Sequence, residues 1–157
     1  MSAIIIQDYE PKYQSDFEQL NKAWLNKYFR IEPVDEYVLT NPGEAILQKG
    51  GAILVALQNE DVTGVVGLLK VNDDIYEFTK MAVSEQHQRK GIAEKLSREA
   101  LKKVKQLGGN RVILYTTRNL YPALALYSKL GFKEVPMDNN AYKRSEIKME
   151  LLLTEDY

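Results

Sequence analysis

Apolar side chains recur along the first third of the chain with two different spacings. Ala3–Gln7 is a short run rich in isoleucine, which predicts a strand. After Pro11 the apolar residues return every three or four positions, which predicts a helix with one buried face. A second, short helix is predicted over Pro33–Thr40, because Asn41-Pro42-Gly43 can end it. The apolar positions of the first helix are Phe17, Leu20, Ala23, Trp24, Leu25 and Phe29.

The middle of the chain contains apolar runs of strand length. Ala52–Leu57 and Val62–Val71 are separated by four polar residues, so they predict an antiparallel hairpin. Asn72-Asp73-Asp74 then turns the chain into a further strand, Ile75–Val83. Alternation along that strand places Glu77 on one face and Phe78 on the other.

Beyond Val83 the pattern becomes helical and then alternates between helices and strands. A helix is predicted from Gly91 to Gly108-Gly109, where glycine can adopt the left-handed conformation that ends a helix. The order of elements predicts one mixed α/β domain over residues 1–157, with no linker or internal repeat. The remaining predicted elements are a strand over Arg111–Thr116, a helix over Leu120–Leu130, and closing strands over Phe132–Val135 and Ile147–Leu153.

Composition excludes several classes of function. The chain has 157 residues, of which 45% are hydrophobic and 27% charged, as in a globular protein with a core. Its formal net charge is −1, so nothing global attracts it to nucleic acid or to an anionic membrane. It contains no cysteine and a single histidine, His87, so thiol chemistry and a metal site are not expected. The apolar run at the start is too short for a signal peptide, which predicts a cytoplasmic protein.

The segment Gln88–Ala93 carries the first chemical signal. It lies between a predicted strand and the start of a predicted helix, where backbone N–H groups lack partners and the helix dipole is positive. Small residues at Gly91 and Ala93 would let an anion approach the backbone, and Arg89 and Lys90 add positive charge. This pattern predicts a diphosphate site, although a glycine at a helix start is more often a plain turn.

Two motifs carry a resemblance to a known family. Val83 followed by Gln88, Gly91 and Ala93 resembles the Gln/Arg-x-x-Gly-x-Gly/Ala signature of the GNAT superfamily of acyl-CoA-dependent N-acetyltransferases. Thr117-Arg118-Asn119 followed by Ala123–Phe132 is similar to the second motif of that family. Both motifs occur in the order of elements that the family fold requires.

The resemblance implies a fold and a co-substrate. The fold would be a twisted, mostly antiparallel sheet of six to seven strands, with a splayed parallel pair at its centre and about four flanking helices. Acetyl-CoA would lie in the V-shaped slot between the splayed strands, with its pantetheine arm along the backbone of the first strand. The residues that the resemblance assigns to the co-substrate are Met81, Ala82, Val83, Gln88, Arg89, Lys90, Gly91, Ile92, Ala93 and Asn119.

The implied reaction needs a base and an acid. An ammonium group must lose a proton before it can attack a thioester, and Glu77 is the expected base, acting through water. Tyr127 is the expected acid for the departing thiolate, with a phenol pKa that needs no large shift. Plainer interpretations remain open: Tyr127 as helix packing, Glu77 as a carboxylate that is solvated or paired in the neighbourhood of Lys80, and Asn119 as a helix cap.

The acceptor is the least defined part of the prediction. In this fold the first two helices and the segment before the last strand would border the acceptor. The residues concerned are the aromatic Trp24, Tyr28 and Phe29, the acidic Glu32, Asp35 and Glu36, and Tyr142 and Arg144. Ordinary surface charge is the simpler interpretation of the carboxylates. His87 is expected to be an exposed loop residue. A module that binds acyl-CoA without catalysis is the alternative function, and pairing through the closing strands would give a homodimer.

Overall fold

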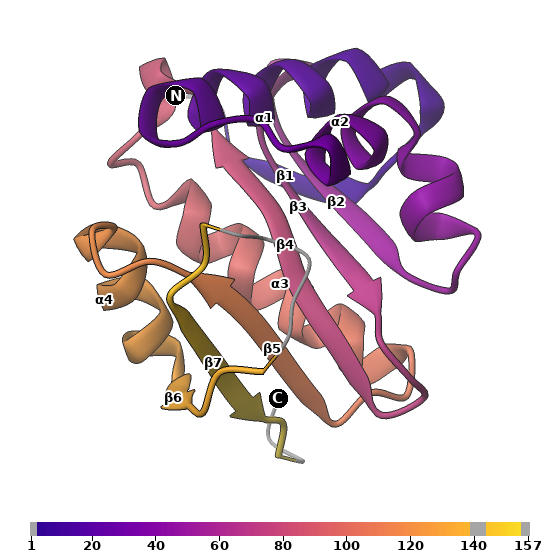
Figure 1. The fold of residues 1–157 in the computed structure, drawn as a ribbon. Coiled ribbons are helices and arrows are strands. Elements are labelled where there is room, and N and C mark those ends of the chain that lie inside the picture. Colours follow the sequence, from indigo (N-terminus) through magenta and orange to yellow (C-terminus); the bar gives the residue numbers. More distant parts are fainter. Residues whose placement is uncertain (1–2, 139–143, 155–157) are drawn as a thin grey trace.

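A seven-stranded sheet forms the centre of the molecule. The computed structural model describes residues 3–138 and 144–154. The strands are β1 (Ile5–Asp8), β2 (Ala52–Gln58), β3 (Asp61–Lys70), β4 (Ile75–Val83), β5 (Arg111–Thr116), β6 (Lys133–Val135) and β7 (Ile147–Leu152). Their order is β1-β2-β3-β4-β5-β7-β6 (Figure 1). Neighbouring strands are antiparallel except β4 and β5, which run parallel at the middle of the sheet.

Helices cover both faces of this sheet. The longer ones are α1 (Gln14–Tyr28), α2 (Pro33–Thr40), α3 (Ile92–Gln106) and α4 (Tyr121–Leu130). α1 and α2 lie on one face, and α3 and α4 lie on the other (Figure 1). Short 3-10 turns at Pro11–Tyr13 and Glu85–His87 and a π turn at Gly43–Leu47 complete the elements. In the part of the chain that the structure describes, no helix has the length and apolar character needed to cross a membrane.

The strands are apolar on both sides because a hydrophobic core lies on each face of the sheet. In β2, Leu54 belongs to the core under α3, whereas the next residue, Val55, belongs to the core under α1. This explains why β2 and β3 are nearly continuous apolar runs in the sequence rather than alternating ones. The predicted fold class is confirmed, including the parallel pair at the centre of the sheet and the four flanking helices.

The parallel pair separates after a short contact. β4 and β5 pair only from Ile75 with Arg111 to Glu77 with Ile113, and within the described residues β4 continues beyond this point with β3 as its only partner. The backbone groups of β4 that face β5 are therefore left without a strand partner from Phe78 onward. The two strands diverge into a V-shaped slot, as the family resemblance implies.

A β-bulge interrupts β4 just after this point. Thr79 pairs with Gly67 and Ala82 pairs with Val65, so two residues of β4 lie opposite one residue of β3. Lys80 takes the extra position with a φ of 55°, which is unusual for a residue with a side chain. The bulge shifts the alternation by one residue. As a result Met81 packs against the same core as Phe78, and Lys80 points toward α2.

Candidate active site

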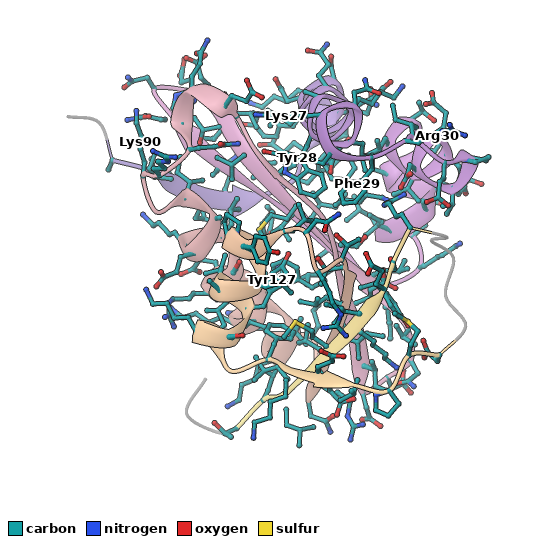
Figure 2. The ribbon with its side chains drawn as sticks, turned by 60° about the vertical axis from the view of Figure 1, so that its left-hand side comes forward. Lys27, Tyr28, Phe29, Arg30, Lys90 and Tyr127 are labelled. Carbon is teal, nitrogen blue, oxygen red and sulfur yellow. The ribbon has the colours of Figure 1, made fainter. Side chains whose placement is uncertain are left out.

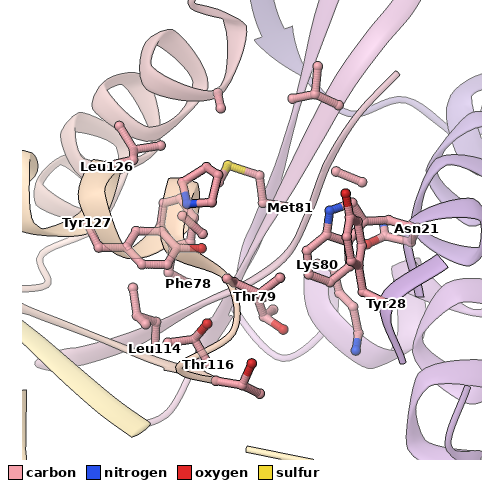
Figure 3. A pocket seen from close by; sticks show the side chains of 18 of the residues that line it. Asn21, Tyr28, Phe78, Thr79, Lys80, Met81, Leu114, Thr116, Leu126 and Tyr127 are labelled. Atoms are coloured by element: carbon pink, nitrogen blue, oxygen red, sulfur yellow. The ribbon is translucent and has the colours of Figure 1, made fainter. Parts of the chain in front are cut away.

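A cavity of about 650 Å³ opens where β4 and β5 separate. Its walls come from α1, the second half of β4, the end of β5, the loop before α3, and α4. Figure 3 shows Tyr127 and Leu126 on one side of this cavity and Tyr28 and Asn21 on the other, with Thr79 and Thr116 between them. The cavity therefore reaches from the α3 and α4 face of the sheet to the α1 face through the slot.

One end of the cavity is built from backbone at the start of α3. Gly91 is the N-cap of α3 and has a φ of 79°, and Arg89 two residues earlier also has a positive φ of 65°. A Cβ atom placed on Gly91 would meet nothing within 4 Å, so the space beside this turn is open. The free N–H groups of the first helical turn, together with the helix dipole, make this end suited to an anion.

The end of β4 and the loop after β5 form the walls next to that turn. Met81, Ala82 and Val83 line the cavity along the edge of β4 that has separated from β5. Asn119 lines it from the opposite side and is exposed. The interpretation of Asn119 as a helix cap is wrong, because α4 begins after Leu120 and has no capping side-chain hydrogen bond.

Tyr127 lies on α4 with its ring held by two phenylalanines. The ring packs edge-on against Phe78 at a centroid distance of 6.2 Å and against Phe132 at 5.9 Å. Figure 3 shows its hydroxyl pointing into the cavity, so packing and access to the cavity are combined in one residue. The expectation of an unshifted phenol is wrong: burial raises the pKa of Tyr127 to about 12. The hydroxyl therefore keeps its proton throughout the physiological range.

Glu77 lies on β4 at the last residue that pairs with β5. Glu77 is only 9% exposed, so the interpretation of this residue as a solvated carboxylate is wrong. Burial is the largest influence on Glu77 and raises its pKa to about 7. The positive charge of Lys80 lowers this pKa, and the negative charge of Asp138 raises it by a smaller amount. A carboxyl group with this pKa can exchange a proton near neutral pH.

Charged side chains from three distant segments meet beside Glu77. Asp35 on α2 is fully buried and accepts a hydrogen bond from Lys80 Nζ at 2.5 Å and from Arg144 Nη1 and Nη2 at 2.8 and 3.0 Å. Arg144 Nη1 also donates to Glu32 at 2.7 Å. Burial raises the pKa of Asp35, but the hydrogen bonds from Arg144 and Lys80 outweigh it and hold that pKa below its ordinary value. The interpretation of Asp35 as surface charge is therefore wrong.

Two buried polar atoms on the cavity wall lack hydrogen-bond partners among the described residues. Thr117 is 4% exposed, and its Oγ1 has no partner. His87 ends the short 3-10 turn before the α3 loop, and its Nδ1 is buried without a partner. The expectation that His87 is an exposed loop residue is wrong, because the residue is partly buried and lines the cavity.

The structure brings together nearly all residues that the sequence assigned to the site. Glu77, Tyr127 and the assigned co-substrate residues line this cavity, with the exception of Lys90, which is exposed outside it (Figure 2). The sequence interpretation missed the part played by Lys80 and Asp35. A lysine inside the apolar strand β4 was the available signal, because a buried ammonium group requires an anionic partner. Tyr142 lies outside the described residues.

Comparison with known proteins places this geometry in a family. Residues 7–132 match the model of the acetyltransferase (GNAT) family. N-acetyltransferase YvbK of Bacillus subtilis is 29% identical over 116 residues, which cover 72% of this chain and 75% of YvbK. Human N-acetyltransferase 8 is 35% identical over 92 residues, but the match spans only 40% of that protein.

Solved structures agree with the sequence comparisons. A GNAT acetyltransferase from Staphylococcus aureus Mu50 superposes with a TM-score of 0.86 and 22% identity, over 97% of this chain and all of that one. The protein yncA of Salmonella typhimurium, solved with its cofactor acetyl-CoA, has a TM-score of 0.76 and 21% identity over 98% of this chain. The chain belongs to the GNAT family of acetyltransferases. It is accordingly an acyltransferase of the N-acetyltransferase type.

Proposed function

We propose that the protein transfers an acetyl group from acetyl-CoA to a primary amine by direct attack within a ternary complex. The observation that carries this proposal is the cavity itself. It joins a helix start that is suited to an anion at one end to a buried carboxyl group, Glu77, and a buried phenol, Tyr127, in the middle. Acetyl-CoA is the co-substrate that the family relationship supports.

The co-substrate would bind along the backbone. Its diphosphate would accept hydrogen bonds from the N–H groups between Arg89 and Ala93, where the turn at Gly91 leaves open space. Its pantetheine arm would pair with the free edge of Met81–Val83 in the manner of an added strand, and Asn119 would contact the arm from the other wall. This placement would bring the thioester to the middle of the cavity.

Glu77 would act as the base. An alkylammonium with a pKa of about 10.4 is almost fully protonated at neutral pH, so the amine must lose a proton before attack. Burial brings the pKa of Glu77 to about 7, which makes it a much better proton acceptor than an exposed carboxylate. The proton would pass from the amine through a water molecule to the Glu77 carboxylate.

Tyr127 would act as the acid. The amine nitrogen forms a bond to the thioester carbon, and a backbone N–H near the end of β4 would donate to the oxygen as negative charge develops there. When the carbon–sulfur bond breaks, the thiolate would take the Tyr127 proton, and the phenolate would regain a proton from Glu77 or solvent. The apolar surroundings that raise the pKa of Tyr127 would also raise the pKa of a thiol beside it. The difference between the two pKa values would therefore be smaller than if Tyr127 alone were shifted.

Release of free thiol from acetyl-CoA, measured across a panel of amines, tests the proposal. We expect amine-dependent release that falls by about 10²-fold or more in Tyr127→Phe, the range typical of a lost general acid, with little change in acetyl-CoA affinity. Acetyl-CoA that raises the melting temperature without release for any small or peptide amine would instead support the binding module. Unchanged release in Tyr127→Phe would remove this residue as the acid.

A further inference from the structure

An aromatic surface covers the end of the cavity that the co-substrate would leave free. Trp24, near the end of α1, lies between Tyr28 at a ring-centroid distance of 5.2 Å and Phe29 at 5.3 Å. All three rings line the cavity, and Tyr28 is 46% exposed. Figure 2 shows Tyr28 and Phe29 at the end of α1, on the side that faces Tyr127. A ligand that enters beside α1 would meet these rings before it reaches Glu77.

The charges at this end are largely balanced before any ligand arrives. Lys80 and Arg144 line the cavity, and both are bound to the carboxylate of Asp35, which lies behind them. Glu32 also binds Arg144 from outside the cavity. Two positive and two negative side chains therefore offset each other, and a ligand carboxylate would gain little attraction while it lost its hydration. Among the described residues, Glu77 is a carboxyl group of this cavity that makes no ion pair within that network, and its carboxylate would favour a basic ligand.

The available volume suits a small molecule. A cavity of about 650 Å³ is in the usual range for one drug-sized ligand, and here it must hold the end of the pantetheine arm as well as the acceptor. A folded protein chain could present only a side chain or a terminus into the space that is left.

We propose that the acceptor is a small primary alkylamine that carries an aromatic ring, with the ring against Trp24, Tyr28 and Phe29 and the amine directed to Glu77. This inference rests on the proposed acetyl transfer and specifies its substrate. Aromatic rings in edge-on or tilted contact gain binding energy beyond the apolar area that they bury. The balanced charges of the neighbouring network disfavour amino acids and other acceptors that keep a free carboxylate.

Binding can be measured without catalysis because Trp24 is the only tryptophan in the chain. Phenethylamine added to the protein with bound CoA should change the tryptophan emission in a saturable way. Spermidine and glycine at equal concentration should give much weaker changes, because neither places a ring against the indole. The same titration with Tyr28→Leu should be right-shifted by about ten-fold, which corresponds to about 1.4 kcal/mol.

Steady-state kinetics supply the second readout. Tyr28→Leu should raise KM for phenethylamine about ten-fold more than it raises KM for n-butylamine. Tyr37→Leu is the matched control, because Tyr37 is a similarly exposed tyrosine (41%) on α2 that does not line the cavity. It should leave both amines unaffected. A Trp24→Phe variant, which keeps an aromatic ring, tests the same wall with less risk to folding.

The outcomes separate this inference from the proposed transfer. Acetyl transfer that is fastest with phenethylamine and sensitive to Tyr28→Leu supports both. Transfer that is fastest with glycine, spermidine or a peptide N-terminus, or that responds equally to the Tyr28 and Tyr37 variants, overturns the substrate assignment and leaves the acetyltransferase intact. Saturable binding of phenethylamine beside CoA without thiol release from acetyl-CoA would overturn the transfer but not the aromatic site.

Discussion

Replacing Asp35 with asparagine would preserve the shape of the side chain and remove the charge that Lys80 and Arg144 share. Asp35 is fully buried, and it accepts hydrogen bonds from both cations and from the backbone N–H of Glu32. The amide of asparagine would direct an N–H group at one of the cations. We therefore expect Asp35→Asn to destabilise the fold markedly.

The size of the effect follows from how deeply each cation is buried. The side chain of Arg144 is 20% exposed and also contacts Glu32 at 2.7 Å, whereas the side chain of Lys80 is 3% exposed. Neutralising Asp35 therefore costs most at Lys80, the more deeply buried of the two cations. Removing one partner of a buried pair typically costs about 3–5 kcal/mol.

Urea and thermal unfolding would measure the loss. For a chain of 157 residues, a cost of about 3–5 kcal/mol lowers the melting temperature by roughly 6–20 °C. Asp8→Asn is the control: Asp8 contacts Lys103 at 3.1 Å, but its side chain is 68% exposed, so its loss should cost less than about 1 kcal/mol.

The double variant Asp35→Asn with Lys80→Met completes the test. With the ammonium removed, most of the lost stability should return, because a buried ion pair replaced by neutral groups is often close to neutral in energy. The reasoning is refuted if Asp35→Asn costs no more than Asp8→Asn, or if the added Lys80→Met substitution restores none of the lost stability.

Three further substitutions follow from the geometry. Gly91→Glu should abolish acetyl-CoA binding in calorimetry, whereas Gly108→Glu, which also has a positive φ and open space around it, should bind normally; equal losses would reject the diphosphate site. Because Glu77 must be ionised to accept a proton, kcat/KM should fall below a pKa of about 7, and Glu77→Gln should lose that limb and most of the rate; an unchanged profile would exclude it as the base. Thr117→Val should stabilise the ligand-free protein by about 1 kcal/mol in urea unfolding, because it removes a buried hydroxyl without a partner; a loss of stability would show that the hydroxyl is hydrogen-bonded.

The fold was largely predictable because local signals and global packing agree in this chain. The predicted helix over Pro33–Thr40 and the predicted strands over Ile75–Val83 and Arg111–Thr116 match the observed elements to the residue. The bulge in β4 was not predictable from alternation. Its sequence shows a lysine where a buried apolar residue fits the pattern, and only the register with β3 reveals that the backbone shifts at Lys80.

The two ends of the cavity differ in how far sequence could describe them. The end proposed to bind the diphosphate is made of consecutive residues around Gly91, so a short motif contains the whole arrangement. The end proposed to hold the acceptor is lined by α1, β4 and the segment before β7, and Asp35 of α2 lies behind it in contact with Lys80 and Arg144. Its charges looked like ordinary surface residues, because no local pattern shows that Asp35 and Arg144 meet.

The buried network near Glu77 gives a physical reason for a lysine at the bulge. A buried ion pair contributes little net stability. Stabilisation of the fold is therefore not a sufficient reason for the contacts among Lys80, Asp35 and Arg144. They do connect β4, α2 and the segment before β7 at the end of the cavity that is proposed to hold the acceptor. The charge of Lys80 also opposes the effect of burial on Glu77, whose pKa of about 7 would otherwise be higher. A carboxyl group with a higher pKa would be protonated at neutral pH and could not accept the amine's proton. The same lysine thus connects the elements beside the proposed reaction centre and lowers the pKa of Glu77, the proposed base.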